Sequence, residues 1–184
     1  MSHLQALTIK SNGGLLRVLS CPIKVCTPIL DKSKGPDKIT DDVLGIWDTG
    51  ASGSVITQAV VDKLQLQPVS FTLVNTASEE NVKSPVYLVD FVLPNGVVLQ
   101  GLRVTLGKLA NAQVLIGMDV INVGDLSITN NKNCTVMTFG VPSTREIDYV
   151  KELQPSQGQV VQLSRQQRRQ QEREQQKANK KSAK

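Results

Sequence analysis

The sequence is poor in histidine, in aromatic residues and in long apolar runs. His3 is the only histidine, so a Ser-His-Asp or Cys-His enzyme would have to draw its base from an unanchored end. A histidine-rich metal centre is not available either, and we expect neither a metal nor a cofactor. Aromatic residues make up 3% of the chain and hydrophobic residues 40%, which predicts an aliphatic core. No apolar run approaches the length that crosses a bilayer, so no membrane contact is expected.

Cysteine is also scarce. Cys21, Cys26 and Cys134 form an odd set whose spacing does not suggest a zinc knuckle. Reduced thiols in a cytosolic protein explain such a set best. The first residues lack a basic start followed by an apolar stretch, so we expect no secretory signal and a cytoplasmic location.

The positive charge of the chain is concentrated at one end. Residues 165–184 hold eight Lys or Arg and two Glu, whereas the other 164 residues hold thirteen basic and fourteen acidic side chains. Few large apolar residues follow Pro155, so this end cannot bury enough surface to order itself. We predict a folded domain over residues 1–140, a linker with a short helix over 141–164, and a disordered or helical basic tail over 165–184.

Short apolar segments separated by turns dominate residues 1–140. The turn signals lie at residues 11–14, 95–96 and 130–131. The first of them predicts a hairpin between residues 6–10 and 15–20. Strands at this spacing, with few helices, predict a small all-β, barrel-like domain.

Two short helices are expected beside these strands. Residues 57–66 suit a helix that Thr57 caps, with Ala59, Val60 and Leu64 on one face. Ser143 and Glu146 form a capping box, which predicts a helix after residue 143.

One acid stands in unusual surroundings. The segment VLGIWDTGASGSVIT, residues 43–57, places Asp48 directly after an apolar strand and before a run of small residues. Burial of a carboxylate costs free energy unless it is hydrogen-bonded, and glycines allow other backbone to approach closely. The turn therefore suits a carboxylate at the floor of a groove. The plainer alternative is an Asx-turn residue that caps a loop.

A lone carboxylate is a poor hydrolytic catalyst. Hydrolysis of an amide needs a base that activates water and an acid that protonates the carbonyl or the leaving amine. Two adjacent carboxyls can do both, because they share one proton. Since Asp-Thr-Gly occurs once in the sequence, the second carboxyl would have to come from another copy of the chain through two-fold symmetry.

The segment IWDTGASGSVI resembles the active-site strand and loop of the retropepsins, the retroviral-type aspartic proteases. A second segment, VLIGMDVI at residues 114–121, is similar to the family's apolar stretch and glycine that lead into a short helix. The resemblance covers residues 14–140, and the pattern is closer to non-viral, bacterial-type members. It implies an all-β acid-protease barrel with one or two short helices, acting as a homodimer on a peptide or protein substrate.

The resemblance also implies roles for particular residues. Asp48 matches the catalytic aspartate, and Thr49 matches the threonine whose hydroxyl bonds to the partner subunit. Gly50 matches the glycine whose carbonyl meets the substrate backbone, and Ala51 the small residue of the groove wall. Gly117 matches the glycine that lets the second loop pass behind the catalytic loop. The implied flap lies between residues 77 and 84, with its tip at Ala77, Ser78, Glu79, Glu80 and Asn81.

The chain departs from the retroviral pattern at the expected dimer contact. Viral members often carry an acid at the position of Ser52 and an arginine at that of Met118, and these two form an ion pair. Both residues are neutral here, so a different dimer contact is required. The flap also lacks the family's glycine-rich tip. For Asp119, we expect an N-cap of the turn that follows rather than a catalytic role.

The function expected from the sequence is that of an aspartic endopeptidase, a cytoplasmic hydrolase that cleaves extended peptides with apolar side chains at the scissile bond. The alternative is a non-catalytic retropepsin-fold dimer that serves binding or assembly. In that case the basic tail would contact nucleic acid or an acidic partner in a salt-sensitive way.

Overall fold

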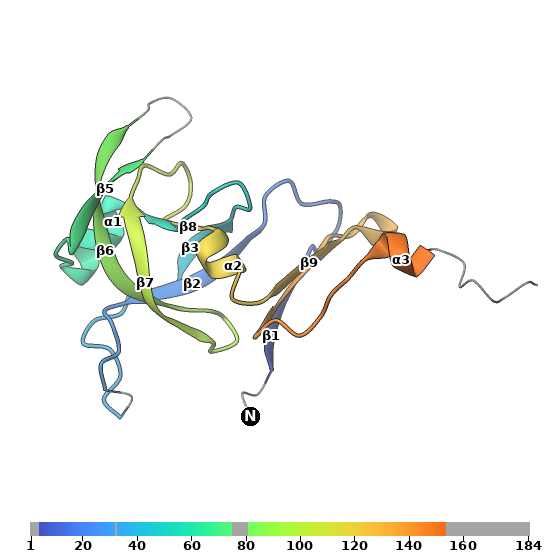
Figure 1. The fold of residues 1–184 in the computed structure, drawn as a ribbon, viewed down its shortest axis with the longest axis horizontal. Helices are drawn as coiled ribbons and strands as arrows, with labels where there is room; N and C mark the ends of the chain where they lie inside the picture. Colours follow the sequence, from blue (N-terminus) through green and yellow to red (C-terminus); the bar gives the residue numbers. More distant parts are fainter. Residues whose placement is uncertain (1–3, 32, 75–80, 154–184) are drawn as a thin grey trace, which may run out of the picture. The chain divides into compact units, whose positions relative to one another are not determined.

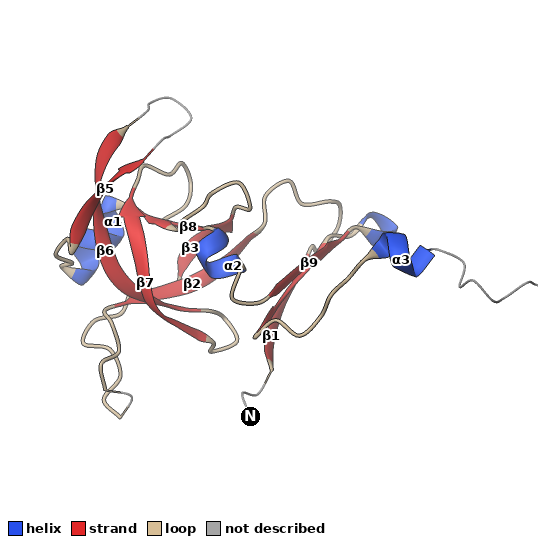
Figure 2. Ribbon diagram, in the orientation of Figure 1, coloured by secondary structure: helices blue, strands red, loops and turns tan. Residues whose placement is uncertain are grey.

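The computed structural model describes residues 4–31, 33–74 and 81–153. The chain divides after Arg145 into two compact units. The strands of the first unit are β1 (Gln5–Lys10), β2 (Ser20–Cys26), β3 (Val43–Trp47), β4 (Val55–Ile56), β5 (Ser70–Val74), β6 (Val82–Val92), β7 (Val98–Leu106), β8 (Val114–Ile116), β9 (Asp125–Thr129) and β10 (Val136–Val141). The same unit contains the helices α1 (Gln58–Leu64) and α2 (Met118–Ile121) and the short 3-10 turn Asn131–Asn133. Figure 2 shows the predominance of strands, which confirms the predicted all-β class.

Six strands close into a barrel in the order β2-β3-β8-β4-β7-β6, and the ring is completed where β6 pairs with β2. The closing register aligns Lys24 with Val92 and Cys26 with Asp90. Closure leaves these strands without free edges. β5 pairs only with β6, outside the ring (Figure 1).

The core is aliphatic, as the composition predicts. Trp47 and Phe139 are the main aromatic contact in it, with ring centroids 4.9 Å apart. α1 packs into the core through Val60, Val61 and Leu64. The expected face was therefore wrong by one position, because Ala59 is exposed. Almost no solvent reaches Ile23, Val25, Ile56, Val89, Phe91, Val104, Val114, Ile116, Val120 and Met137.

The predicted hairpin at the start of the chain is wrong. β1 pairs with β10, and β10 pairs with β9, in a three-stranded antiparallel sheet. Leu7 lies opposite Phe139, and both are buried. Pairing with β10 buries the apolar side of β1, whereas residues 15–18 stay exposed outside any strand. The expected hairpins at residues 95–96 and 130–131 are confirmed as β6–β7 and β9–β10.

The second unit contains α3 (Tyr149–Leu153) within its described residues. The predicted capping box is wrong. The Ser143 hydroxyl donates to Asp125 at 2.6 Å, and Asp148 accepts from the N–H groups of Val150 and Lys151 at 3.0 and 3.1 Å. The predicted boundaries at residues 140 and 164 stay predictions, and the predicted basic tail lies outside the described residues.

Candidate active site

Asp48 lies where β3 ends. Trp47 pairs in parallel register with Ile116 of β8, and the Asp48 N–H donates to the Ile116 carbonyl at 2.9 Å. Asp48 follows the last paired residue of a barrel strand. The sheet therefore fixes its backbone, while the residue is partly exposed. A side chain held this way needs little reorganisation before it meets a ligand.

The first contact of the Asp48 carboxylate comes from its own loop. The Gly50 N–H donates to Oδ1 at 2.8 Å, and the Ala51 N–H donates to the Asp48 carbonyl at 3.3 Å. This is the geometry of an Asx turn. Oδ2 has no hydrogen-bond partner among residues 4–31, 33–74 and 81–153. The turn therefore fixes one oxygen and leaves the other for a further ligand. Asp48 can thus be an Asx-turn residue and still present a carboxylate oxygen to a groove. Thr49, the next residue of the loop, is exposed.

A second loop lies directly behind the first. A Cβ on Gly117 would stand 2.6 Å from the carbonyl carbon of Gly53 and 2.7 Å from its oxygen. Only a glycine permits this approach without displacement of backbone. The next residue completes the contact, because the Met118 N–H donates to the Ala51 carbonyl at 2.8 Å.

Asp119 ties the two loops together, a role that the sequence did not predict. Its Oδ1 accepts from the Ser54 hydroxyl at 2.7 Å and its Oδ2 from the Ser54 N–H at 3.0 Å. The same hydroxyl accepts from the buried Gly117 N–H at 3.0 Å. The expectation that Asp119 is an N-cap was wrong, since Gly117 occupies that position. The partners lie 65 residues apart, and no local pattern points from one to the other.

Trp47 connects the Asp48 strand to its surroundings. Its indole N–H donates to the Cys21 sulfur at 3.3 Å, and its ring packs against Phe139 of β10. Burial raises the pKa of the Cys21 thiol, although the hydrogen bond from Trp47 opposes this. The strand that carries Asp48 is thereby packed against both the barrel and the three-stranded sheet.

The expected flap corresponds to the β5–β6 hairpin. Ala77, Ser78, Glu79 and Glu80 lie outside the described residues. Asn81 is described and has a left-handed φ of 55°. In Figure 1 this hairpin and the loops of residues 48–54 and 107–113 lie toward the same end of the barrel.

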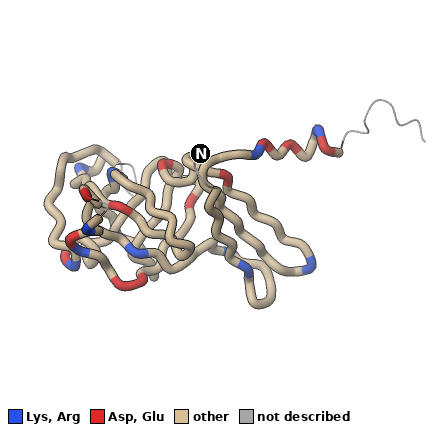
Figure 3. Tube along the Cα trace, turned by 90° about the horizontal axis from the view of Figure 1, so that it is seen from below, with Lys and Arg blue, Asp and Glu red and all other residues tan. Residues whose placement is uncertain are grey.

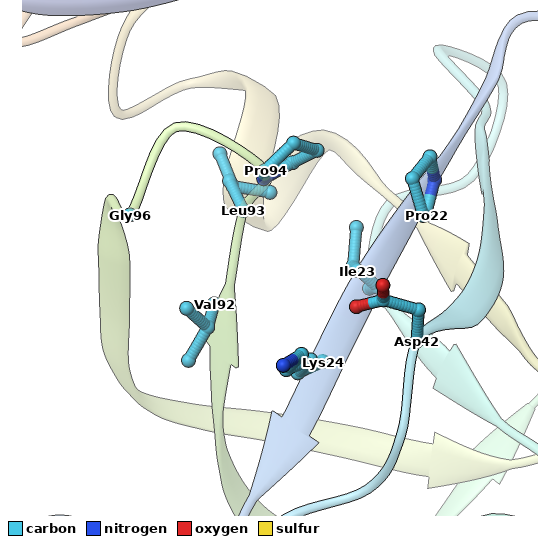
Figure 4. A pocket seen from close by; sticks show the side chains of 8 residues that line it. All are labelled: Pro22, Ile23, Lys24, Asp42, Val92, Leu93, Pro94 and Gly96. Carbon is cyan, nitrogen blue, oxygen red and sulfur yellow. The ribbon is translucent and has the colours of Figure 1, made fainter.

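A pocket of about 360 Å³ lies elsewhere. Pro22, Lys24, Asp42 and Pro94 are among its lining residues (Figure 4). Asp42 precedes β3 whereas Asp48 follows it, so six residue steps of about 3.3 Å place their backbones about 20 Å apart. The pocket therefore does not belong to the Asp48 site.

Charge is mixed over the unit that ends at Arg145, where Lys and Arg are interspersed with Asp and Glu (Figure 3). No group of three or more His, Cys, Asp or Glu side chains in the described residues could hold a metal ion. None of the helices described is long and apolar enough to span a membrane.

A family model described as gag-polyprotein putative aspartyl protease matches residues 42–123. The matched segment contains the Asp48 loop, the β5–β6 hairpin and Gly117. This part of the chain is similar to the aspartyl proteases that the model describes, which supports the predicted resemblance to the retropepsin-like family.

Among solved structures, the chain is similar to a retropepsin-like aspartic protease from Rickettsia conorii. The TM-score is 0.46 and the identity 12%, over 77% of this chain and 98% of that one. No curated protein sequence matches the chain.

Proposed function

We propose that the protein is an aspartic endopeptidase whose active site forms between two copies of the chain, each of which supplies Asp48. The observation that carries this proposal is the Asp48 loop itself. One carboxylate oxygen is held by the Gly50 N–H at 2.8 Å, the other has no partner in the described chain, and the family model covers the loop.

The chemistry follows from two carboxyls that lie about 3 Å apart and share one proton, the arrangement known for aspartic proteases. The ionised Asp48 removes a proton from a water held between the carboxyls, and the water oxygen attacks the peptide carbonyl. The protonated Asp48 gives its proton to the carbonyl oxygen, which yields a neutral tetrahedral diol. The Asp48 that took the water proton then gives it to the amide nitrogen, while the other, now ionised, accepts a proton from one diol hydroxyl, so that the C–N bond breaks and an acid and an amine leave. The step requires neither a covalent intermediate nor a metal.

The proposed substrate is an extended peptide with apolar side chains beside the scissile bond. The β5–β6 hairpin would close over it and add main-chain hydrogen bonds. The hydroxyl of the exposed Thr49 would bond to the partner copy. The Gly50 carbonyl would accept from the substrate backbone, and Ala51 would leave room for its side chains.

The proposal is tested by incubation of the purified protein with a diverse peptide library from pH 4 to 7, with products read by mass spectrometry. Asp48→Asn should abolish cleavage, because it removes the base while preserving the shape of the side chain. Asp42→Asn, the same change at the other end of β3, is the matched control and should cleave like the wild type. Cleavage by Asp48→Asn within about tenfold of the wild type would refute the assignment.

The dependence of rate on pH gives a second test. Only the singly protonated pair contains both an acid and a base, so kcat/KM should follow a bell-shaped curve with both limbs at acidic or near-neutral pH. Hydrolysis that still increases above pH 9, or that EDTA abolishes, would contradict the mechanism.

A further inference from the structure

An exposed apolar loop lies next to the Asp48 strand. β2 and β3 are antiparallel, with Ser20 opposite Ile46, and the Trp47 N–H extends this register by donating to the Leu19 carbonyl at 2.9 Å. Val18 is the next residue of one strand and Asp48 the next of the other. Neighbouring strands are about 5 Å apart, so the chain at Val18 leaves the sheet beside the carboxylate.

Three side chains of this loop are apolar and uncovered. Leu15 is 56% exposed, Leu16 39% and Val18 53%. We name these three residues the Leu15–Val18 patch. Adjacent apolar side chains that a folded chain leaves exposed indicate an interaction surface.

The loop that carries the patch is anchored. The Leu16 N–H donates to the Thr135 hydroxyl at 2.9 Å, and the Ser11 hydroxyl donates to the Gly14 carbonyl at 2.7 Å. A β-bridge joins Gly14 to Cys134. The patch is thus held at a defined place by the β9–β10 connection, and a partner would meet it at little cost in ordering.

We propose that the Leu15–Val18 patch is a contact surface for a second copy of this chain. The inference rests on the proposed function, because two Asp48 carboxyls that share a proton place a two-fold axis between them, about 1.5 Å from each. A residue one strand spacing from Asp48 then lies near the partner. Apolar side chains suit that position, since Ser52 and Met118 are neutral and offer no ion pair.

The experiment compares the full-length protein with the double variant Leu15→Asp, Val18→Asp by sedimentation equilibrium and by hydrolysis of a peptide that the wild type cleaves. The variant should dissociate at concentrations at least about a hundredfold higher than the wild type, because each Asp carries a charge into an apolar contact. Leu30→Asp is the control. Leu30 is 94% exposed in the segment after β2, away from Asp48, and its variant should dissociate within about twofold of the wild type.

A mixture of oppositely charged variants shows whether the double variant lost its contact with the partner or lost its fold. Leu15→Lys, Val18→Lys should also fail to dimerise alone, but an equal mixture with the Asp variant should restore dimers, because a patch close to the two-fold axis faces its own copy and opposite charges then meet across the axis. Double variants that dimerise like the wild type, or a mixture that stays monomeric, would overturn the inference. Sedimentation does not depend on catalysis. A wild-type dimer that cleaves nothing would refute the proposed function and leave the patch as an interface, whereas an active wild-type monomer would refute both.

Discussion

Replacement of Ser54 by alanine should destabilise the protein far more than its small size suggests. Ser54 is 1% exposed, and its hydroxyl donates to Asp119 at 2.7 Å and accepts from the Gly117 N–H at 3.0 Å. Ser54→Ala would leave the buried Gly117 N–H without a partner, which costs about 1–3 kcal/mol. Asp119 would keep its bonds from the N–H groups of Ser54 and Val120. It is half-buried, so water can replace part of the lost bond. The free energy of unfolding should therefore fall by about 2–3 kcal/mol.

Urea denaturation, followed by the fluorescence of the single tryptophan, measures this loss. All variants must be compared at one protein concentration, because assembly would stabilise the folded chain. Ser70→Ala is the matched control. The Ser70 hydroxyl accepts from Arg103 at 2.7 Å on the surface, so its loss should change the free energy of unfolding by less than about 0.5 kcal/mol. Equal effects of the two substitutions, or a loss below about 1 kcal/mol for Ser54→Ala, would refute the reasoning.

Three further predictions use other parts of the chain. Gly117→Ala should lower the free energy of unfolding by about 2–3 kcal/mol, because its Cβ would meet the Gly53 backbone at 2.6 Å, whereas Gly53→Ala has open space and should be tolerated in the same urea titration. Burial and then the charge of Asp90 raise the pKa of the Cys26 thiol to about 11 from 9.0. The unfolded thiol therefore loses its proton first, and stability should fall as pH rises from about 9 to 11, with a shallower fall in Cys26→Ala. A chain that ends at residue 154 should cleave a short peptide at the rate of the full chain, since the basic segment has too little apolar bulk to join a core; a folded but inactive truncation would contradict this.

The Asp48 loop could be predicted from the sequence because its signals are local. An apolar strand, an acid and two glycines within six residues specify a strand end and a tight turn without reference to any distant segment. The second loop was found in the same way, from the apolar run that ends at Gly117. Its closeness to Gly53 followed only from the family resemblance.

The errors came from partners that lie far apart in the chain. β1 was assigned to a local hairpin because residues 11–14 are a turn signal, but its partner β10 lies more than 120 residues away. Register there is set by the burial of Leu7 against Phe139, which a local pattern cannot reveal. The link between Ser54 and Asp119 was missed for the same reason, and so was the closure of the barrel by β2 and β6.

The most direct test of a site shared between two copies is a subunit-mixing experiment. Wild-type chains are mixed with Asp48→Asn chains at constant total concentration, allowed to exchange, and assayed for peptide hydrolysis. If each active site needs an Asp48 from both copies, activity follows the square of the wild-type fraction, so an equal mixture retains about a quarter of the wild-type rate. An equal mixture that retains about half would show that each chain works alone and would contradict the shared dyad.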